Sequence, residues 1–557
     1  MFPINITSFN ETFSKTSLLT YITVAISVAV FLYFASLKFV LSLQQCGYRA
    51  KKYFKWVTSP ETPYLSRLML LCLLGFLFFS VLNITFSPIT GNELGSFIGL
   101  LSFYLFTFLY IKSESSVNAK VPLKKTKRIV RLMITYVLVL VLFSFGFITL
   151  LNYLAFLIGS EIVALLRLSL ICVLPIITPF LLFIAYLINE PVERILRKSI
   201  IKRATEKLDK SSVLKIAITG SYAKTSVKEI LKTILSQKFR VLATPESYNT
   251  PLGISLTTKK LDGTHDIFIV EMGARRKGDI KELADMVKPN LAILTGINNQ
   301  HLETFGSEEI IKNTKYELFE SLKDGAKAFF SSDSEGSLEL FNRFSGEKYL
   351  AGLNGENNFV WAKDIKLLDN VLSFNLMIEN KAVPVSTTLL GKHNISNICL
   401  AVSVALKLGM SIEEITLGVN RLTSVWHRLE LVANNKDVTI IDDSYNSNVN
   451  GFKAAMEVLD LYNARKIVLT PGLVELGKME NVVNYELGKL LSAHANIVIV
   501  IGKHNAEMLI NGLKDGGMDV ENIHFAKNLQ KANEYLNSIL KPKDVVLFEN
   551  DLPDNYN

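Results

Sequence analysis

Cysteine and histidine are scarce in this chain, which argues against several common kinds of site. The 557 residues include four cysteines and seven histidines, and no two cysteines have the CxxC spacing of a zinc or redox motif. Their scattered positions give no disulfide framework, so we expect the globular part to lie in a reducing compartment, the cytoplasm. The four cysteines are Cys46, Cys72, Cys172 and Cys399.

Two other features are missing. Residues 1–16 lack the basic stretch of a signal peptide, and the apolar run that follows leads to further apolar runs instead of a cleavage site. The apolar runs contain no array of acids and histidines, so a proton relay or transporter is not predicted. The net charge of +9 is compatible with nucleic-acid binding, but the basic residues cluster between apolar runs, where membrane topology explains them. We therefore expect no nucleic-acid partner.

Apolar residues are concentrated before residue 190, and the mean hydropathy of the whole chain is +0.29. We predict five transmembrane helices, each long enough for a hydrocarbon core of ~30 Å. Basic residues flank the first and third connections and follow the last span, which predicts an outside N-terminus and a cytoplasmic C-terminal part. The predicted spans are Ser17–Ser42, Ser66–Asn83, Leu94–Ile111, Ile129–Leu151 and Leu165–Ile188.

The stretch Ile216–Ser226, IAITGSYAKTS, has the strand–turn–helix form of a phosphate-binding loop. A short apolar run ends at Gly220, small residues follow, and Lys224 and Thr225 open a helical pattern. Backbone N–H groups at such a helix start can face an anion, the lysine adds charge, and a hydroxyl can reach Mg²⁺. Ile218 stands where the longer Walker form has its first glycine. We interpret the stretch as an ATP-binding loop.

Strands and helices alternate after the apolar region, which predicts an α-helical transmembrane bundle followed by α/β domains. We expect a P-loop-type ATPase domain with a mostly parallel sheet, and then a smaller Rossmann-like α/β domain. The predicted strands are Lys215–Thr219, Ile267–Val270, Ala292–Leu294, Val438–Ile441, Ile467–Leu469, Ile497–Ile501 and Val545–Phe548, and a helix is predicted over Ser226–Ser236. The predicted domains are the transmembrane domain 1–190, a basic juxtamembrane connector 191–212, the central ATP-binding domain 213–422 and the C-terminal domain 423–557.

From Gly220 to the C-terminus, eight motifs occur in the order of one known family. They are TGSYAKTS (219–226), YNTPLG (248–253), EMGARRKGDI (271–280), NNQHLETFGSEEIIKNTKYEL (298–318), GKHNISN (391–397), HRLE (427–430), DDSYNSN (442–448) and ELG (475–477). The chain thereby resembles the Mur ligase family, ATP-dependent amide ligases that build the stem peptides of peptidoglycan. It is most similar to the MurF branch, the UDP-N-acetylmuramoyl-tripeptide–D-alanyl-D-alanine ligases.

The resemblance implies a reaction in which ATP phosphorylates a carboxylate and an amine attacks the resulting acyl phosphate. It implies that Lys224 holds the β- and γ-phosphates and that Thr225 and Glu271 bind Mg²⁺. It further implies that His301 binds a second Mg²⁺, together with Lys315 carried as a carbamate. With Arg428, residues Lys224, His301 and Lys315 form the implied catalytic set.

The resemblance also implies a set of nucleotide contacts. Asn249 lies near the transferring phosphate, and Arg428 and Asp443 reach the nucleotide from the C-terminal domain. The adenine contacts are His393, Asn394 and Asn397, and the loop contacts are Gly220, Ser221, Tyr222, Ala223, Lys224, Thr225 and Ser226. Taken singly, most of these residues would be read as caps, loop residues or solvated helix faces; only their joint order and spacing favours a site.

Four positions depart from the family pattern. Ala223 replaces the glycine that precedes the loop lysine, and its Cβ restricts the backbone. Val449 replaces a proline, and Asn484 stands where the family has a histidine. The segment Phe548–Pro553 lacks the glycine-rich end of the family, which suggests a different amine pocket.

The family normally begins with a soluble domain that grips uridine diphosphate, and here we expect the helical bundle in its place. We therefore predict a multi-pass protein of the bacterial inner membrane that ligates an amino acid or short peptide to a lipid-linked or membrane-associated carboxylate of the cell envelope. Inner-leaflet lipids, and an envelope glycosyltransferase or flippase, are the partners that this function implies.

Three alternatives stay open at the level of sequence. The chain could be a MurF-type ligase of the soluble UDP-MurNAc-tripeptide that has gained an anchor. It could be a poly-γ-glutamate-type synthetase, which repeats amide addition at the membrane. It could also be a catalytically degenerate, nucleotide-sensing scaffold for envelope assembly, a hypothesis that would rest on Ala223.

Overall fold

The structure is a computed structural model that divides the chain into two compact units, Met1–Arg197 and Lys198–Asn557, each described here by itself. The described residues are 18–59, 69–75, 77–78, 81, 123–158, 170, 173–246, 248–297, 305, 307–353, 355, 357–368, 370–379, 381–424, 427–432, 437–444, 448–474, 476 and 479–550.

The first unit is helical. Its elements are α2 (Leu18–Gln45), α3 (Ala50–Thr58), α5 (Lys127–Ile158), the short 3-10 helix η1 (Leu174–Ile177) and the first part of α7 (Thr178–Lys210). Within the described ranges, three helices, not the five predicted, are long and apolar enough to cross a membrane, by length and composition only. The predicted span 66–83 lies partly, and the span 94–111 wholly, outside the described residues.

Helix α7 joins two segments that were predicted separately, the fifth span, which ends at Ile188, and the basic connector, which begins at Pro191. The helix continues through Pro191 to Lys210. A proline inside a helix removes one backbone hydrogen bond, so side-chain contacts must hold the two halves together. Glu190 accepts from Arg128 at 3.3 Å and from Arg197 at 2.6 Å, which places an ion-pair cluster next to the proline.

Segments from three basic regions of the sequence meet at one end of this bundle. The Gln44 side chain exchanges two hydrogen bonds, of 2.8 and 2.9 Å, with the backbone of Lys124. The Arg128 guanidinium lies 3.8 Å from the centre of the Tyr48 ring and also contacts Glu190. Basic segments that share one end agree with the alternation of basic and neutral connections in the sequence.

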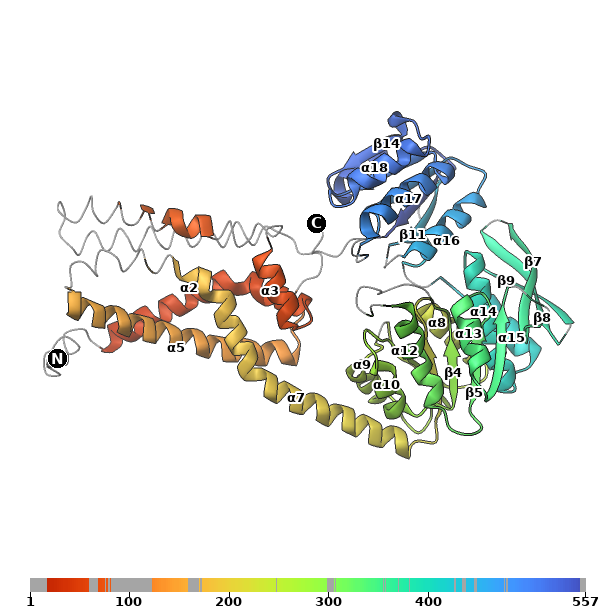
Figure 1. The fold of residues 1–557 in the computed structure, drawn as a ribbon, viewed down its shortest axis with the longest axis horizontal. Helices are drawn as coiled ribbons and strands as arrows, with labels where there is room; N and C mark the ends of the chain where they lie inside the picture. Colours follow the sequence, from red (N-terminus) through yellow and green to blue (C-terminus); the bar gives the residue numbers. More distant parts are fainter. Residues whose placement is uncertain are drawn as a thin grey trace. The chain divides into compact units, whose positions relative to one another are not determined.

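The second unit contains two sheets (Figure 1). The strands of the first are β1 (Leu214–Thr219), β2 (Val241–Ala243), β3 (Ile267–Glu271), β4 (Leu291–Leu294), β5 (Lys327–Ser331), β6 (Glu347–Gly352), β7 (Val360–Leu368), β8 (Val371–Ile378) and β9 (Lys381–Thr387). Their order is β2-β3-β1-β4-β5-β6-β7-β8-β9, with parallel pairs up to β7 and antiparallel pairs from β7 to β9. The mostly parallel sheet confirms the α/β prediction, whereas the antiparallel extension was not predicted.

Helices cover both faces of this sheet because its central strands are apolar on both sides. In β1, Ile216 and Ile218 face the core beneath α8, α14 and α15, while Ala217 faces the core beneath α9, α10 and α12. Figure 1 shows these two groups on either side of β4. The helices are α8 (Lys224–Leu235), α9 (Pro251–Thr258), α10 (Asp279–Val287), α12 (Glu308–Glu320), α13 (Glu335–Arg343), α14 (Lys392–Lys407) and α15 (Ile412–Asn420).

The second sheet has the order β10-β11-β15-β12-β13-β14 and is parallel except for β10. Its strands are β10 (Glu430–Val432), β11 (Thr439–Asp443), β12 (Lys466–Thr470), β13 (Ile497–Ile501), β14 (Ile523–Ala526) and β15 (Val545–Glu549). Its helices are α16 (Val449–Asp460), α17 (Glu480–His494), α18 (Ala506–Asp515), the short 3-10 helix η3 (Val520–Asn522) and α19 (Leu529–Ile539). All four strands predicted here are present, and β10 and β14 are additional.

Candidate active site

The loop between β1 and α8 packs so closely on the end of β4 that its first residue must be glycine. A Cβ on Gly220 would lie 2.1 Å from Oγ1 of Thr295. The Ser221 amide donates to the Gly296 carbonyl at 2.8 Å, which ties the loop to the same place. The loop therefore leads directly to the N-terminus of the 12-residue helix α8, where unpaired backbone N–H groups favour an anion.

Ala223 precedes α8 in the left-handed conformation, with φ of +58°. For a residue with a Cβ this conformation costs roughly 1–2 kcal/mol relative to the right-handed one. The departure noted in the sequence is thus a strained position in the structure, and Ala223 also lines the cavity described below.

Lys224 folds back on its own loop. Its Nζ donates to the carbonyl oxygens of Gly220 at 2.9 Å and of Ser221 at 3.3 Å. Burial lowers the pKa of this ammonium, nearby Glu271 opposes that shift, and the positive charge of Arg428 adds to it. A phosphate that entered the loop would give the ammonium a stronger partner than the two neutral carbonyls.

Glu271, at the end of β3, accepts hydrogen bonds from polar side chains of two other segments. Its Oε2 accepts from the Thr225 hydroxyl at 2.9 Å, and its Oε1 accepts from Nδ2 of Asn249 at 3.0 Å. A Cβ on Gly273 would lie 2.8 Å from Cγ of Asn249, so this glycine makes room for the amide. A hydroxyl and a carboxylate that converge in this way provide the hard oxygen ligands that suit Mg²⁺.

Lys315 lies on α12, is 4% exposed, and forms no ion pair with a carboxylate of the described residues. Burial, together with the charge of Lys224, lowers its pKa to about 7, against smaller opposing effects of Asp279 and Glu317. A large part of this amine is therefore uncharged at neutral pH, which is the form that reacts with CO₂ to give a carbamate. The predicted partner His301 lies outside the described residues.

A cavity of about 530 Å³ extends from this loop to the C-terminal α/β part, a volume in the usual range for small-molecule sites. His393, Asn394 and Asn397 at the start of α14 lie along it. Asn394 donates to the Leu390 carbonyl at 2.8 Å and accepts from Asn397 at 3.3 Å. The surrounding protein atoms lower the pKa of His393 to about 4, and Arg428 adds to the shift, so this imidazole is neutral.

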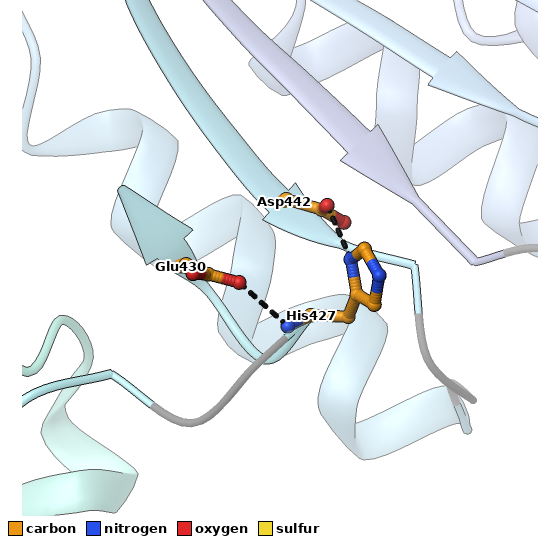
Figure 2. A group of neighbouring side chains, drawn as sticks. All are labelled: His427, Glu430 and Asp442. Carbon is orange, nitrogen blue, oxygen red and sulfur yellow. Dashed lines mark hydrogen bonds and ion pairs between the residues drawn. The ribbon is translucent and has the colours of Figure 1, made fainter. Parts of the chain in front are cut away.

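Arg428 lies in an unusual turn between two left-handed residues, His427 with φ of +55° and Leu429 with φ of +46°. Figure 2 shows how the turn is held: Glu430 accepts from the His427 amide at 2.8 Å, and Asp442 contacts the ring at 2.5 Å. His427, Glu430 and Asp442 are close enough to share a metal ion. The ring and both carboxylates nevertheless have partners within the turn, so we interpret them as the support that aims Arg428 into the cavity.

Asp443 completes the cavity wall from β11, and its Oδ1 accepts from the Leu429 amide at 3.2 Å. Burial raises the pKa of its carboxyl to about 6, while Leu429 and Arg428 oppose the shift. Glu549, fully buried on the neighbouring strand β15, shares a hydrogen bond with it. The position of Glu549 beside Asp443 could not be predicted from neighbouring residues in the sequence, because it depends on the pairing of β11 with β15.

The loop and cavity thus bring together most of the predicted site. Tyr222, Ala223, Ser226, His393, Asn394, Asn397, Arg428 and Asp443 line the cavity. Thr225, Asn249 and Glu271 form a separate hydrogen-bonded group. The Lys224 ammonium donates to the carbonyl oxygens of Gly220 and Ser221 in the loop. Asp333, which also lines the cavity, was not predicted.

The family motifs DDSYNSN (442–448) and ELG (475–477) are described only in part. Of 475–477, only Leu476 is described, and residues 445–447 are outside the described chain. Asn448 caps α16 by accepting from the amides of Asn450 and Gly451. Asn484, which stands for the family's histidine, is fully buried and exchanges hydrogen bonds with the Leu473 backbone, so its role here is structural.

Two family models match this chain. The Mur ligase middle domain matches residues 218–405, and the Mur ligase glutamate ligase domain matches residues 427–549. Together the two matches cover more than half of the chain.

Two curated relatives are both named UDP-N-acetylmuramoyl-tripeptide–D-alanyl-D-alanine ligase. The protein from Buchnera aphidicola (Baizongia pistaciae) is 30% identical over 330 residues, which are 59% of this chain and 71% of that protein. The protein from Escherichia coli K12 is 28% identical over 292 residues, which are 52% of this chain and 65% of that protein.

Solved structures give the same picture of the fold. The Thermotoga maritima MurF ligase in complex with ADP has a TM-score of 0.58 and 26% identity, and the match covers 64% of this chain and 80% of that one. A MurF structure from Acinetobacter baumannii has a TM-score of 0.59 at 24% identity, over 65% of this chain and 78% of that one.

Proposed function

Since this chain belongs to the Mur ligase family of ATP-dependent ligases, we propose that it is a MurF-type enzyme acting on UDP-MurNAc-tripeptide and D-alanyl-D-alanine. The proposal takes its substrates from the names of the relatives. The observation that carries its chemistry is the convergence of Thr225, Asn249 and Glu271 beside the loop lysine Lys224.

The proposed reaction forms an amide in two steps. The γ-phosphoryl group of ATP passes to the terminal carboxylate of the tripeptide, and ADP leaves. The amine nitrogen of the dipeptide then attacks the acyl carbon, phosphate leaves, and the amine gives up a proton. Lys224 would stabilise the negative charge on the transferring phosphoryl group, and Arg428 would add charge from the other side of the cavity.

Thr225 and Glu271 would hold Mg²⁺, because their oxygens converge within 2.9 Å of each other. The ion would neutralise charge on the phosphates. Lys315, with its pKa of about 7, would be carried as a carbamate and would hold a second ion with His301. The Asn249 amide, fixed by Glu271, would orient a phosphate oxygen.

The test uses the full chain purified in detergent. Incubation with ATP, Mg²⁺, UDP-MurNAc-tripeptide and D-alanyl-D-alanine should release phosphate and yield a product heavier by the dipeptide minus one water. Lys224→Ala should abolish both signals. Wild-type protein that forms no product with this pair, under conditions where a known MurF does, would reject this substrate assignment.

A second candidate substrate is a lipid-linked or membrane-associated carboxylate, which the three long apolar helices favour. In this version the chain is a multi-pass protein of the bacterial inner membrane, and the carboxylate is presented at the inner leaflet, where a glycosyltransferase or flippase could supply it. Holding both reactants at one surface raises their effective concentration. The same assay with lipid-linked envelope precursors in place of the nucleotide distinguishes the two substrates.

Two further results would point elsewhere. Repeated addition of glutamate with ATP consumption would identify a poly-γ-glutamate-type synthetase. Tight nucleotide binding without turnover of any of these substrates would identify a nucleotide-sensing scaffold.

A further inference from the structure

Lys228 is a buried cation directly behind the candidate Mg²⁺ site. It lies in α8 one turn after Lys224, and its side chain is fully buried. Its Nζ lies 3.6 Å from Oε2 of Glu271 and donates to the backbone carbonyl of Glu246. It also lies 3.4 Å from Oε1 of Glu229, a carboxylate that is one-third exposed.

A buried ammonium is expensive unless it is paired, since removal from water costs several kcal/mol. Glu229 is screened by solvent, so the principal compensation comes from Glu271, whose side chain is 2% exposed. Lys228 is the cation in direct contact with Glu271, because the Lys224 ammonium acts on this carboxylate only at a distance and its two hydrogen-bond donors, Thr225 and Asn249, are neutral.

The geometry also links Lys228 to the segment that carries Asn249. Glu246, whose carbonyl accepts from Lys228, is itself left-handed with φ of +44°. The ammonium therefore contacts both the carboxylate of Glu271 and the backbone of Glu246, where the segment that carries Asn249 begins.

We propose that Lys228 is a positioning residue that keeps Glu271 correctly oriented for Mg²⁺ before the ion arrives. This rests on the proposed function, because it assigns Glu271 to the metal. The Thr225 hydroxyl now donates to Glu271; on metal binding it must turn a lone pair to the ion, which removes that donor. Lys228 at Oε2 and Asn249 at Oε1 then remain as the partners that fix the carboxylate, and Lys228 is the charged one. Partners behind a metal ligand are typically worth 10–100-fold in metal affinity.

The chain offers a matched control. Lys232 is one turn further along α8, lies 3.6 Å from the same Glu229, and is 47% exposed. Lys232→Met removes the same charge from the same helix and from the same acidic neighbour, but it leaves Glu271 untouched. A general effect of helix charge would appear in both variants, whereas a positioning effect would appear only at Lys228.

The experiment measures Mn²⁺ binding by electron paramagnetic resonance in the presence of saturating ADP, with the full chain in detergent. Lys228→Met should weaken Mn²⁺ binding at least tenfold, and ADP binding without metal should change less than threefold. Lys228→Arg, which retains the charge, should recover most of the loss, and Lys232→Met should match wild type. The melting temperature of each variant shows whether it is folded.

If Lys228→Met does not fold, Lys228→Gln is measured instead. The glutamine side chain is neutral, is similar in length to lysine, and can still donate to the Glu246 carbonyl. Wild-type Mn²⁺ affinity in a folded Lys228→Met or Lys228→Gln protein would overturn the proposal. Equal weakening in Lys232→Met would overturn it as well. Failure of wild-type protein to bind ADP with Mn²⁺ would instead reject the proposed function.

Discussion

Asp443 and Glu549 face each other across the paired strands β11 and β15 and share a hydrogen bond between their carboxyl groups. Glu549 is the donor in this bond, which favours the ionised form of Asp443 and opposes the effect of burial on its pKa. Burial raises the pKa of Asp443 to about 6 in the folded chain, from an ordinary value near 4. Asp443 is therefore a source of pH-dependent stability in the wall of the cavity.

The sign of that dependence follows from proton binding. Between about pH 4 and pH 6 the folded chain holds a proton that the unfolded chain has lost, so this group's contribution to stability falls as pH rises. Asp443→Asn cannot ionise and should raise the free energy of unfolding at pH 8 by roughly 1–2 kcal/mol, with about half of that gain at pH 5. Chemical denaturation without nucleotide measures both, and Asp285→Asn, at an exposed site, is the control. A pH-independent gain would contradict the assignment.

Ala223→Gly should stabilise the chain because it removes the Cβ from a left-handed residue. We expect a gain of about 0.5–1 kcal/mol, after allowance for the extra freedom of glycine in the unfolded chain. Ala454→Gly, in helix α16 and also on the cavity wall, should lose about 1 kcal/mol. Thermal unfolding of both variants checks the pair, and a loss in both would show that Ala223 is not strained.

Lys315 should take up CO₂. Its pKa of about 7 means that the reactive, uncharged amine increases as pH rises from 6 to 8. With ¹³CO₂ at fixed pressure, a carbamate carbon signal should grow over that range and disappear in Lys315→Met. Lys312→Met, on the same helix but with a side chain paired to Glu308 and Glu339, should leave the signal unchanged. Persistence of the signal without Lys315 would place the carbamate elsewhere.

His427→Ala should loosen the turn that aims Arg428, because the contact between its ring and Asp442 is lost. We expect kcat/KM for ATP to fall about tenfold, which corresponds to about 1.4 kcal/mol of transition-state stabilisation. His494→Ala removes a comparable contact, 2.7 Å to Asp460, on the surface of the same α/β part. Measuring kcat/KM for ATP in the two variants side by side tests whether His427 positions Arg428. Equal losses in both variants would show that His427 contributes only to general stability.

The loop and its helix could be predicted because their signals are local. Apolar residues alternate into Gly220, and helical spacing begins at Lys224, so strand, turn and helix follow from neighbours in the chain. The convergence of Thr225 with Glu271 needed the family motifs, since the two lie on different elements. Lys228 could not be found in this way: a charged residue in a helical pattern reads as solvent-facing, and only the position of β3 buries it.

The antiparallel strands β7, β8 and β9 were missed for a different reason. Their turns use left-handed Asn370 and Glu379, with φ of +63° and +47°, where a hairpin signal would have had glycine. The continuity of helix α7 through Pro191 had no local signal, because proline ordinarily weakens a helix and the ion pair of Glu190 with Arg128 joins residues far apart in sequence.

The strand order of the second sheet also bears on synthesis. Strand β15 lies between β11 and β12, although it is made after β12, β13 and β14. Until β15 has been synthesised, β11 and β12 each have a strand edge that lacks its partner β15. Such edges are prone to pair with the wrong chain. Vectorial folding of this part is therefore impossible, and we expect it to depend on chaperones until β15 has emerged and joined the two halves of the sheet.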